Sequence, residues 1–251
     1  MNFHLRIWKQ EHHDTPGRFE AIEAHDIPAE ASLLEMLDIV NERFVNERKM
    51  PIAFESDCRE GICGTCSMVI NGMPQGPGRG AACQVYMRSF QDGETITLEP
   101  YRVASFPLVK DLVVDRSAYD RIIQSGGFIT EHTGGAPDAN TTLISKKIAD
   151  RAMDAASCIG CGACAAACPN SSAMLFVGAK VTHLSLLPQG QPERRDRART
   201  MVRAMDEEGF GNCSNYYACE AVCPSAISAS VIATLNREFV AAEIAEAIGA
   251  V

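Results

Sequence analysis

Cysteine is the residue type in this sequence with the greatest capacity for chemistry. The 251 residues include 11 cysteines, which fall into three groups along the chain. These groups are Cys58, Cys63, Cys66 and Cys83; Cys158, Cys161, Cys164 and Cys168; and Cys213, Cys219 and Cys223. We expect a cytosolic chain, because it has neither an apolar run of roughly 18 residues nor the apolar segment of a signal peptide. Disulfides rarely persist in the cytosol, so cysteine this abundant indicates bound metal.

The first group has the spacing of a plant-type [2Fe–2S] site. Cys58-x4-Cys63-x2-Cys66 places three thiolates in one tight loop, and Cys83 follows after sixteen residues as the fourth ligand. Two glycines within the loop allow its backbone to curl closely around a cluster. Four cysteines would also serve zinc, but zinc sites usually present their ligands as two pairs. The spacing therefore favours a [2Fe–2S] cluster over zinc.

The second and third groups have the spacing of interlocked bacterial ferredoxin sites. The second is a C-x2-C-x2-C-x3-C-P run, and its fourth cysteine ligates the other cluster in two-cluster ferredoxins. The third is a C-x5-C-x3-C-P run, which supplies the partner ligands. On the same template, the middle ligand position of the third group falls on Tyr216, and a phenol supplies no thiolate. The third group is therefore one ligand short.

The remaining seven cysteines divide accordingly between a four-iron and a three-iron cluster. A [4Fe–4S] cluster is expected on Cys158, Cys161, Cys164 and Cys223. A [3Fe–4S] cluster is expected on Cys168, Cys213 and Cys219. For this second set the alternative is a [4Fe–4S] cluster that has water or another residue on its fourth iron, because ligation varies among such clusters.

The elements around the first group predict a small sheet with one packed helix. Alternating apolar and polar residues from Phe3 to Trp8 indicate a half-buried strand, and a turn leads into a second strand at 19–27. Ser32 and Glu35 are spaced as a capping box at the start of a helix. Short strands around 68–70 and 95–98 complete the predicted sheet.

The second half of the chain has a helical pattern, and a connector precedes it. Glycine-rich polar stretches at 125–127 and 133–137 indicate loops. We therefore place an N-terminal domain at 1–105, a connector at 106–150 that begins with a helix, and a C-terminal domain at 151–251. Alanine-rich segments recur in this last domain and strand signals are sparse, which indicates helices wrapped around the metal centres.

A run of arginines in the C-terminal domain would form a positive strip on a helix. The run consists of Arg194, Arg195, Arg197, Arg199 and Arg203. Such a strip could bind anionic lipid or an acidic partner. The simpler interpretation is a solvated helix face, partly paired with Asp196, Asp206 and Glu207.

The order of the three sites resembles the iron–sulfur subunit of succinate dehydrogenase and fumarate reductase. The resemblance covers essentially the whole chain and is strongest in the strings SDCREGICGTC at 56–66 and CIGCGAC at 158–164. The string VVDR at 113–116 is similar to the connector of that family. One plant-type site followed by two interlocked bacterial sites, the last lacking a ligand, is more specific than any single motif.

The resemblance implies an α+β fold and a role in electron transfer. The fold would be an N-terminal β-grasp, plant-type [2Fe–2S] ferredoxin-like domain and a C-terminal all-helical, bacterial [4Fe–4S] ferredoxin-like domain. The subunit would have no catalytic residue, because succinate and fumarate would bind to a separate FAD-containing flavoprotein subunit. Electrons would pass from FAD through the [2Fe–2S], [4Fe–4S] and [3Fe–4S] clusters to membrane quinone. A membrane anchor cytochrome b subunit would hold the chain peripherally on the cytoplasmic face of the cell membrane.

The sequence near the expected quinone end differs from many members of that family. Pro169 is followed by Asn170 and two serines rather than by a segment with tryptophan, and Ser214 replaces a common histidine. The resemblance therefore gives only weak support for a quinone pocket on this subunit. The string from Cys168 to Pro188 resembles the branch that has a di-haem cytochrome b anchor, for which menaquinone is the expected quinone.

Two other functions fit the same cysteine pattern. One is a free multicluster ferredoxin that serves soluble partners, and the other is an iron–sulfur subunit for a different flavin dehydrogenase. Nucleic-acid binding is disfavoured, because 32 acidic residues outnumber 23 basic ones and give a net charge of −9. No glycine-rich nucleotide fingerprint follows a predicted strand, so we expect no NAD or ATP site.

Overall fold

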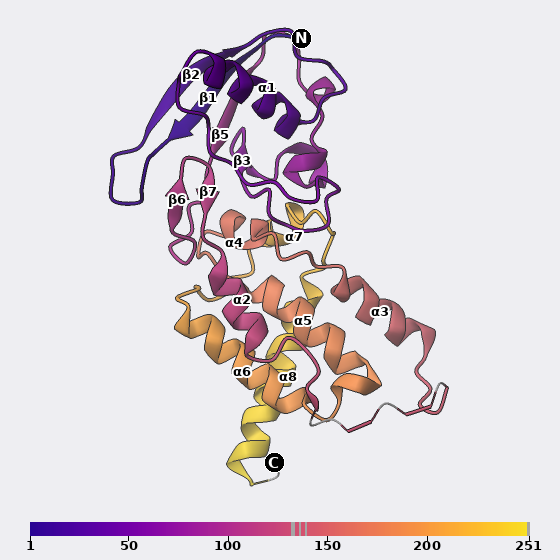
Figure 1. Cartoon of the computed structure of the whole chain (residues 1–251). Coiled ribbons are helices and arrows are strands. Elements are labelled where there is room, and N and C mark those ends of the chain that lie inside the picture. The colour runs from indigo at the N-terminus through magenta and orange to yellow at the C-terminus, as the bar shows by residue number, and fades with distance from the viewer. Residues whose placement is uncertain (132–133, 136, 139, 250–251) are drawn as a thin grey trace.

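The protein has a sheet-containing N-terminal half stacked on a helical C-terminal half (Figure 1). The structure is a computed structural model and describes residues 1–131, 134–135, 137–138 and 140–249. The loop expected at 133–137 lies partly outside this range. The expected mixed α+β fold is confirmed, because the main sheet with its packed helix lies in the first half of the chain and a helical bundle in the second.

The main sheet of the N-terminal half has five strands in the order β2-β1-β5-β3-β4. They are β1 (Phe3–Lys9), β2 (Arg18–Ala24), β3 (Val69–Ile70), β4 (Met73–Pro74) and β5 (Thr95–Glu99). The central strands β1 and β5 are parallel, with His4 opposite Thr95. The alternation predicted for the first strand is confirmed, since Phe3, Leu5 and Ile7 are buried. Strand β2 ends before the predicted Ile27, because Asp26 adopts a left-handed conformation at φ 57° that no strand accommodates.

Helix α1 (Leu33–Asn46) covers this sheet and begins at the predicted capping box. The Glu35 amide donates to Ser32 Oγ at 3.2 Å, and the Ser32 amide donates to Glu35 Oε2 at 2.6 Å. The buried face of the helix consists of Leu33, Leu34, Met36, Leu37 and Val40. Three short 3-10 helices follow β4, at Pro77–Arg79, Ala82–Gln84 and Met87–Ser89.

A hairpin, rather than a helix, follows Phe106. Strands β6 (Leu108–Lys110) and β7 (Val113–Val114) precede helix α2 (Ser117–Gln124), so the helix expected at the start of the connector begins later. Asp111 turns the chain between the two strands at φ 49°. Its buried carboxylate accepts hydrogen bonds from Lys9 Nζ at 2.6 Å and from the amides of Gln10 and Ala53. These long-range contacts attach the hairpin to the sheet domain.

The C-terminal half is a bundle of helices around α5. Its elements are α3 (Lys146–Ala156), α4 (Ala163–Ala167), α5 (Met174–Leu186), a 3-10 turn (Pro188–Gly190), α6 (Arg194–Glu207), α7 (Ala218–Ala221) and α8 (Ser230–Ala247). Helix α5 contacts α3, α6 and α8 and is buried along most of its length. Tyr101, Val103 and Phe106 also pack into this helical core. Within the described ranges, no helix is both long enough and apolar enough to cross a membrane.

The arginine run of α6 is largely paired with helix α8. Arg194 pairs with Glu238, while Arg199 and Arg203 both pair with Glu243 and Glu246. The partners of these three arginines thus lie about 40 residues along the chain, not among the acidic residues expected from the sequence.

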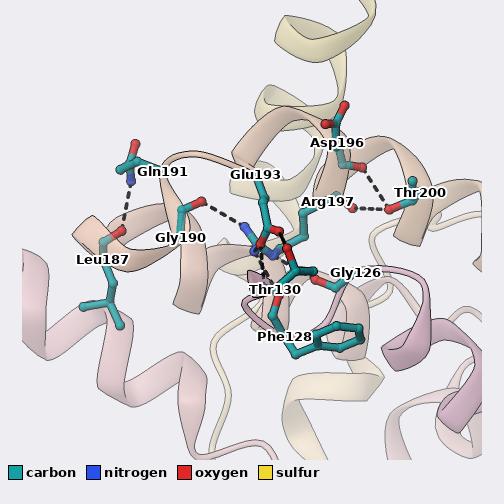
Figure 2. Close-up of polar contacts among 10 residues, drawn as sticks. All are labelled: Gly126, Phe128, Thr130, Leu187, Gly190, Gln191, Glu193, Asp196, Arg197 and Thr200. Carbon is teal, nitrogen blue, oxygen red and sulfur yellow. Dashed lines mark hydrogen bonds and ion pairs between the residues drawn. The ribbon is translucent and has the colours of Figure 1, made fainter. Parts of the chain in front are cut away.

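Arg197 is an exception within the run, because it is buried. Its guanidinium donates to the carbonyls of Gly126, Phe128 and Gly190 at 2.8–3.1 Å and to the Glu193 carboxylate at 3.1 Å (Figure 2). The prediction of a solvated arginine face is therefore wrong at this position. Arg197 instead ties the connector to the helical bundle.

Candidate metal centres

The first cysteine group lies in the loop between α1 and β3 and in the 3-10 helix at Ala82–Gln84. Cys66 and Cys83 are buried, whereas Cys58 and Cys63 are half-buried at the outer end of the loop. Gly61 and Gly64 have φ values of 74° and 72°, a region that residues with a Cβ rarely adopt. The tight curl expected of the loop is therefore present.

Backbone amides and burial act in opposite directions on the thiols of this loop. The amides of Glu60 and Ile62 lower the pKa of Cys58 to about 7, and the Glu60 nitrogen lies 3.3 Å from the sulfur. Burial raises the pKa of Cys66 to about 12. A buried thiol of this kind becomes a thiolate when a bound metal compensates its charge. The loop thus favours the thiolate at Cys58 by itself, whereas bound metal would favour the thiolate at Cys66.

Four cysteines from the second and third groups line one cavity in the helical half. They are Cys158, Cys161, Cys164 and Cys223, and Tyr119 and Phe176 complete the apolar wall beside them. Helix α4 starts within this site, directly after Gly162, which has φ 81°. Burial raises the pKa of Cys161 to about 12 and raises the pKa of Cys158 and Cys164 as well. The structure therefore brings together the four cysteines that the sequence spacing assigns to one site.

A second cavity is lined by the other three cysteines, Cys168, Cys213 and Cys219. Tyr216 lies beside them, with 64% of its surface exposed. The Asn215 amide donates to Cys213 Sγ at 3.4 Å, so this sulfur accepts a backbone hydrogen bond. Leu175 lines both cavities, so the two cysteine sets are neighbours.

The donor chemistry of all three sets fits iron–sulfur clusters. Each set consists of cysteine sulfurs, several of which accept backbone N–H hydrogen bonds. In the part of the chain that the structure describes, no three His, Cys, Asp or Glu side chains converge tightly enough to hold a single metal ion. An iron–sulfur cluster makes no such demand, because its thiolates are distributed over several irons rather than bound to one ion.

The first and second cysteine loops meet directly. A Cβ added at Gly64 would lie 2.3 Å from the carbonyl oxygen of Ile159 and 3.1 Å from the nitrogen of Cys161. Ser67 Oγ donates to the Cys161 carbonyl at 3.1 Å, and Arg116 donates to the Gly160 carbonyl at 2.9 Å. Sequence reasoning singled out no role for Ser67, because it contacts a segment 94 residues away.

Comparison with known proteins agrees with this arrangement. The family model described as a 2Fe-2S iron-sulfur cluster binding domain matches residues 4–121, and the model described as a 4Fe-4S dicluster domain matches residues 154–227. The succinate dehydrogenase iron-sulfur subunit of Bacillus subtilis is 32% identical over 203 residues, which cover 76% of this chain and 74% of that protein. The chain belongs to the succinate dehydrogenase and fumarate reductase iron–sulfur subunit family.

Another member of this iron–sulfur subunit family aligns along nearly the full chain. The fumarate reductase iron-sulfur subunit of Wolinella succinogenes is 28% identical over 246 residues, covering 94% of this chain and 96% of that protein. A chain of the solved structure described as the Mycobacterium smegmatis Sdh1 complex in the apo form has the same fold, with a TM-score of 0.69. It is 22% identical to this subunit and 94% of each chain is covered. The expected family and fold class are thus confirmed.

Proposed function

We propose that this iron–sulfur subunit relays electrons through three clusters held by its eleven cysteines. A [2Fe–2S] cluster is assigned to Cys58, Cys63, Cys66 and Cys83. A [4Fe–4S] cluster is assigned to Cys158, Cys161, Cys164 and Cys223, and a [3Fe–4S] cluster to Cys168, Cys213 and Cys219. When bound, such clusters accept and release single electrons at potentials that the protein sets.

The observation that carries this proposal is the adjacency of the three cysteine sets, the first beside the second and the second beside the third. The Gly64 backbone joins the first loop to the second, and Leu175 lies in the walls of both remaining cavities. The largely apolar wall of the four-cysteine cavity limits the access of water to its sulfurs and so strengthens each electrostatic influence on them. A chain that serves as a relay needs such adjacency, whereas independent carriers do not.

The partners of the subunit follow from its family. The relatives are named for succinate dehydrogenase and fumarate reductase, so we assign a FAD-containing flavoprotein, which carries the substrate site, and a membrane anchor cytochrome b. Ile62 is 64% exposed at the tip of the first loop, an apolar side chain available to the flavoprotein. Tyr216 and Tyr217 are exposed at the third site, on the side assigned to the anchor and to menaquinone. We assign the subunit to the cytoplasmic face of the cell membrane, bound through the anchor.

Electron paramagnetic resonance of the purified protein, recorded once oxidised and once reduced, tests the cluster assignment. The oxidised protein should give a [3Fe–4S] signal, and reduction should reveal the [2Fe–2S] and [4Fe–4S] centres. Absence of the oxidised signal in intact, anaerobically prepared protein would favour the alternative of a four-iron cluster with a non-cysteine ligand.

Copurification from membranes tests the partners. A covalent flavoprotein and a haem-bearing membrane subunit should accompany the native chain. Migration of the three-cluster protein alone would support a free multicluster ferredoxin instead. A different flavoprotein, without succinate or fumarate activity, would indicate a subunit of another dehydrogenase.

A further inference from the structure

Tyr119 of helix α2 lies beside the four-cysteine cavity, although the connector that carries it precedes the helical bundle in sequence. Its side chain is 3% exposed and forms part of the cavity wall. Its hydroxyl lies 3.5 Å from Cys164 Sγ, which is within hydrogen-bond distance for sulfur. A buried tyrosine hydroxyl normally has a polar partner, and here that partner is a cysteine sulfur.

The ring of Tyr119 is held in place by three other aromatic rings. It stacks on Phe176 with the centroids 3.8 Å apart and the planes within 3° of parallel. Phe106 packs edge-on at 5.0 Å, and Phe210 lies at 5.5 Å. Because these rings come from the connector, α5 and the segment after α6, the direction of the hydroxyl is set by the packing of the whole bundle.

The chemistry of the two groups determines which one donates. A cysteine that ligates iron has no proton, so its sulfur can only accept, and a phenol is protonated at physiological pH and can donate. Hydrogen bonds to cluster sulfurs are among the factors that set reduction potential. A donated hydrogen bond stabilises the more negatively charged, reduced form and therefore raises the potential.

We propose that Tyr119 is a positioning residue whose hydroxyl donates to Cys164 Sγ and raises the reduction potential of the [4Fe–4S] cluster. This inference rests on the proposed assignment of that cluster to Cys158, Cys161, Cys164 and Cys223. It adds to that assignment a specific residue that favours the reduced state of the [4Fe–4S] cluster, the middle cluster of the relay.

The chain offers a matched control in a second buried tyrosine. Tyr101 is also 3% exposed and packs in the same apolar cluster as Tyr119. Its hydroxyl, however, accepts a hydrogen bond from Gln75 Nε2 at 2.9 Å. Tyr119→Phe and Tyr101→Phe therefore each remove one buried hydroxyl, but only Tyr119→Phe removes a hydrogen bond to a cysteine sulfur.

The test is a redox titration of the whole protein followed by electron paramagnetic resonance. We expect Tyr119→Phe to shift the [4Fe–4S] midpoint to a more negative potential and to leave the other two midpoints unchanged. Tyr101→Phe should leave all three unchanged. An unaltered [4Fe–4S] midpoint in Tyr119→Phe, or an equal shift in both variants, would overturn the inference while leaving the ligand assignment intact. Absence of any [4Fe–4S] signal in the unmodified protein would overturn the assignment itself and the inference with it.

A second substitution keeps the inference testable if the phenylalanine variant loses its cluster. Tyr119→3-fluorotyrosine retains the ring and the hydroxyl but makes the phenol more acidic, and hence a stronger donor. The [4Fe–4S] midpoint should then shift in the positive direction. A negative shift, or none, would show that the hydroxyl does not donate to the cluster ligand.

Discussion

Gly64 in the first cysteine loop lies against the carbonyl oxygen of Ile159 in the second, with no room for a side chain between them. The Cβ of any other residue at position 64 would be 2.3 Å from that oxygen. Ser67, three residues further on, donates to the carbonyl of Cys161 at 3.1 Å. The two cysteine loops are therefore joined through their backbones, which keeps the first and second sites adjacent.

Gly64→Ala should weaken this junction much more than an equivalent change elsewhere. Gly72→Ala is the matched control, because Gly72 has φ 79° but has no atom within 4 Å of its added Cβ. Both variants incur about 1–2 kcal/mol for the left-handed backbone. Only Gly64→Ala adds a backbone clash, which typically costs a further ~1–3 kcal/mol. Thermal unfolding should show the larger loss for Gly64→Ala, together with slower electron transfer from the first cluster to the second. Equal losses in the two variants would contradict this role.

Tyr216→Cys should convert the three-iron site into a four-iron site. Tyr216 lines the cavity of Cys168, Cys213 and Cys219 and is 64% exposed, so its replacement removes little packing. The new thiol would supply the ligand that the third group lacks. Iron analysis should show one additional iron per chain, and the oxidised [3Fe–4S] signal should disappear. Tyr217→Cys is the control and should leave the signal in place; unchanged iron content in Tyr216→Cys would refute the prediction.

Asp111→Ala should destabilise the N-terminal half strongly. The substitution removes the carboxylate that pairs with the Lys9 ammonium and accepts hydrogen bonds from two backbone amides. The Lys9 side chain is only 15% exposed. Removing one partner of a buried ion pair costs about 3–5 kcal/mol. Asp150→Ala breaks the exposed pair with Lys146 and should cost only ~0.2–1 kcal/mol. Chemical unfolding of both variants measures the difference, and similar values would show that the buried pair does not anchor the hairpin.

Two glutamates should affect acid stability in opposite directions. The hydrogen bonds from Arg121 lower the pKa of Glu208, so this group stabilises the fold above the ordinary glutamate pKa of ~4.3. That contribution is lost as the pH falls through the lowered pKa. Burial raises the pKa of Glu55, so its contribution is present below ~4.3 and is lost as the pH rises through the raised pKa.

The matched variants Glu208→Gln and Glu55→Gln separate these two effects. At pH 7, Glu208→Gln should lower the thermal midpoint, and its difference from the unmodified protein should shrink below pH ~4. Glu55→Gln should leave the midpoint at pH 7 unchanged or raise it. A fall of equal size in both variants at pH 7 would contradict the assigned pKa directions.

Local sequence patterns predicted much of the N-terminal half. The alternation from Phe3 to Ile7 and the capping box at Ser32 are read from neighbouring residues, and both occur as predicted. The hairpin after Phe106 was missed, because Asp111 turns the chain by bonding to Lys9 and Ala53, both more than 50 residues away. No pattern within a few residues of Asp111 contains those contacts.

The sequence by itself determined the family, and the cysteine spacing predicted how the cysteines group, because thiolates that share a cluster occur at characteristic spacings. Which groups surround those sulfurs was decided only by the tertiary structure. The contact of Gly64 with Ile159 and that of Tyr119 with Cys164 join segments 95 and 45 residues apart. Such contacts depend on how the helices and loops pack, and packing follows from the summed burial of many side chains rather than from the spacing of a few. The cysteine spacing thus predicted where the clusters bind, and the packing decided which residues contact the cysteine sulfurs.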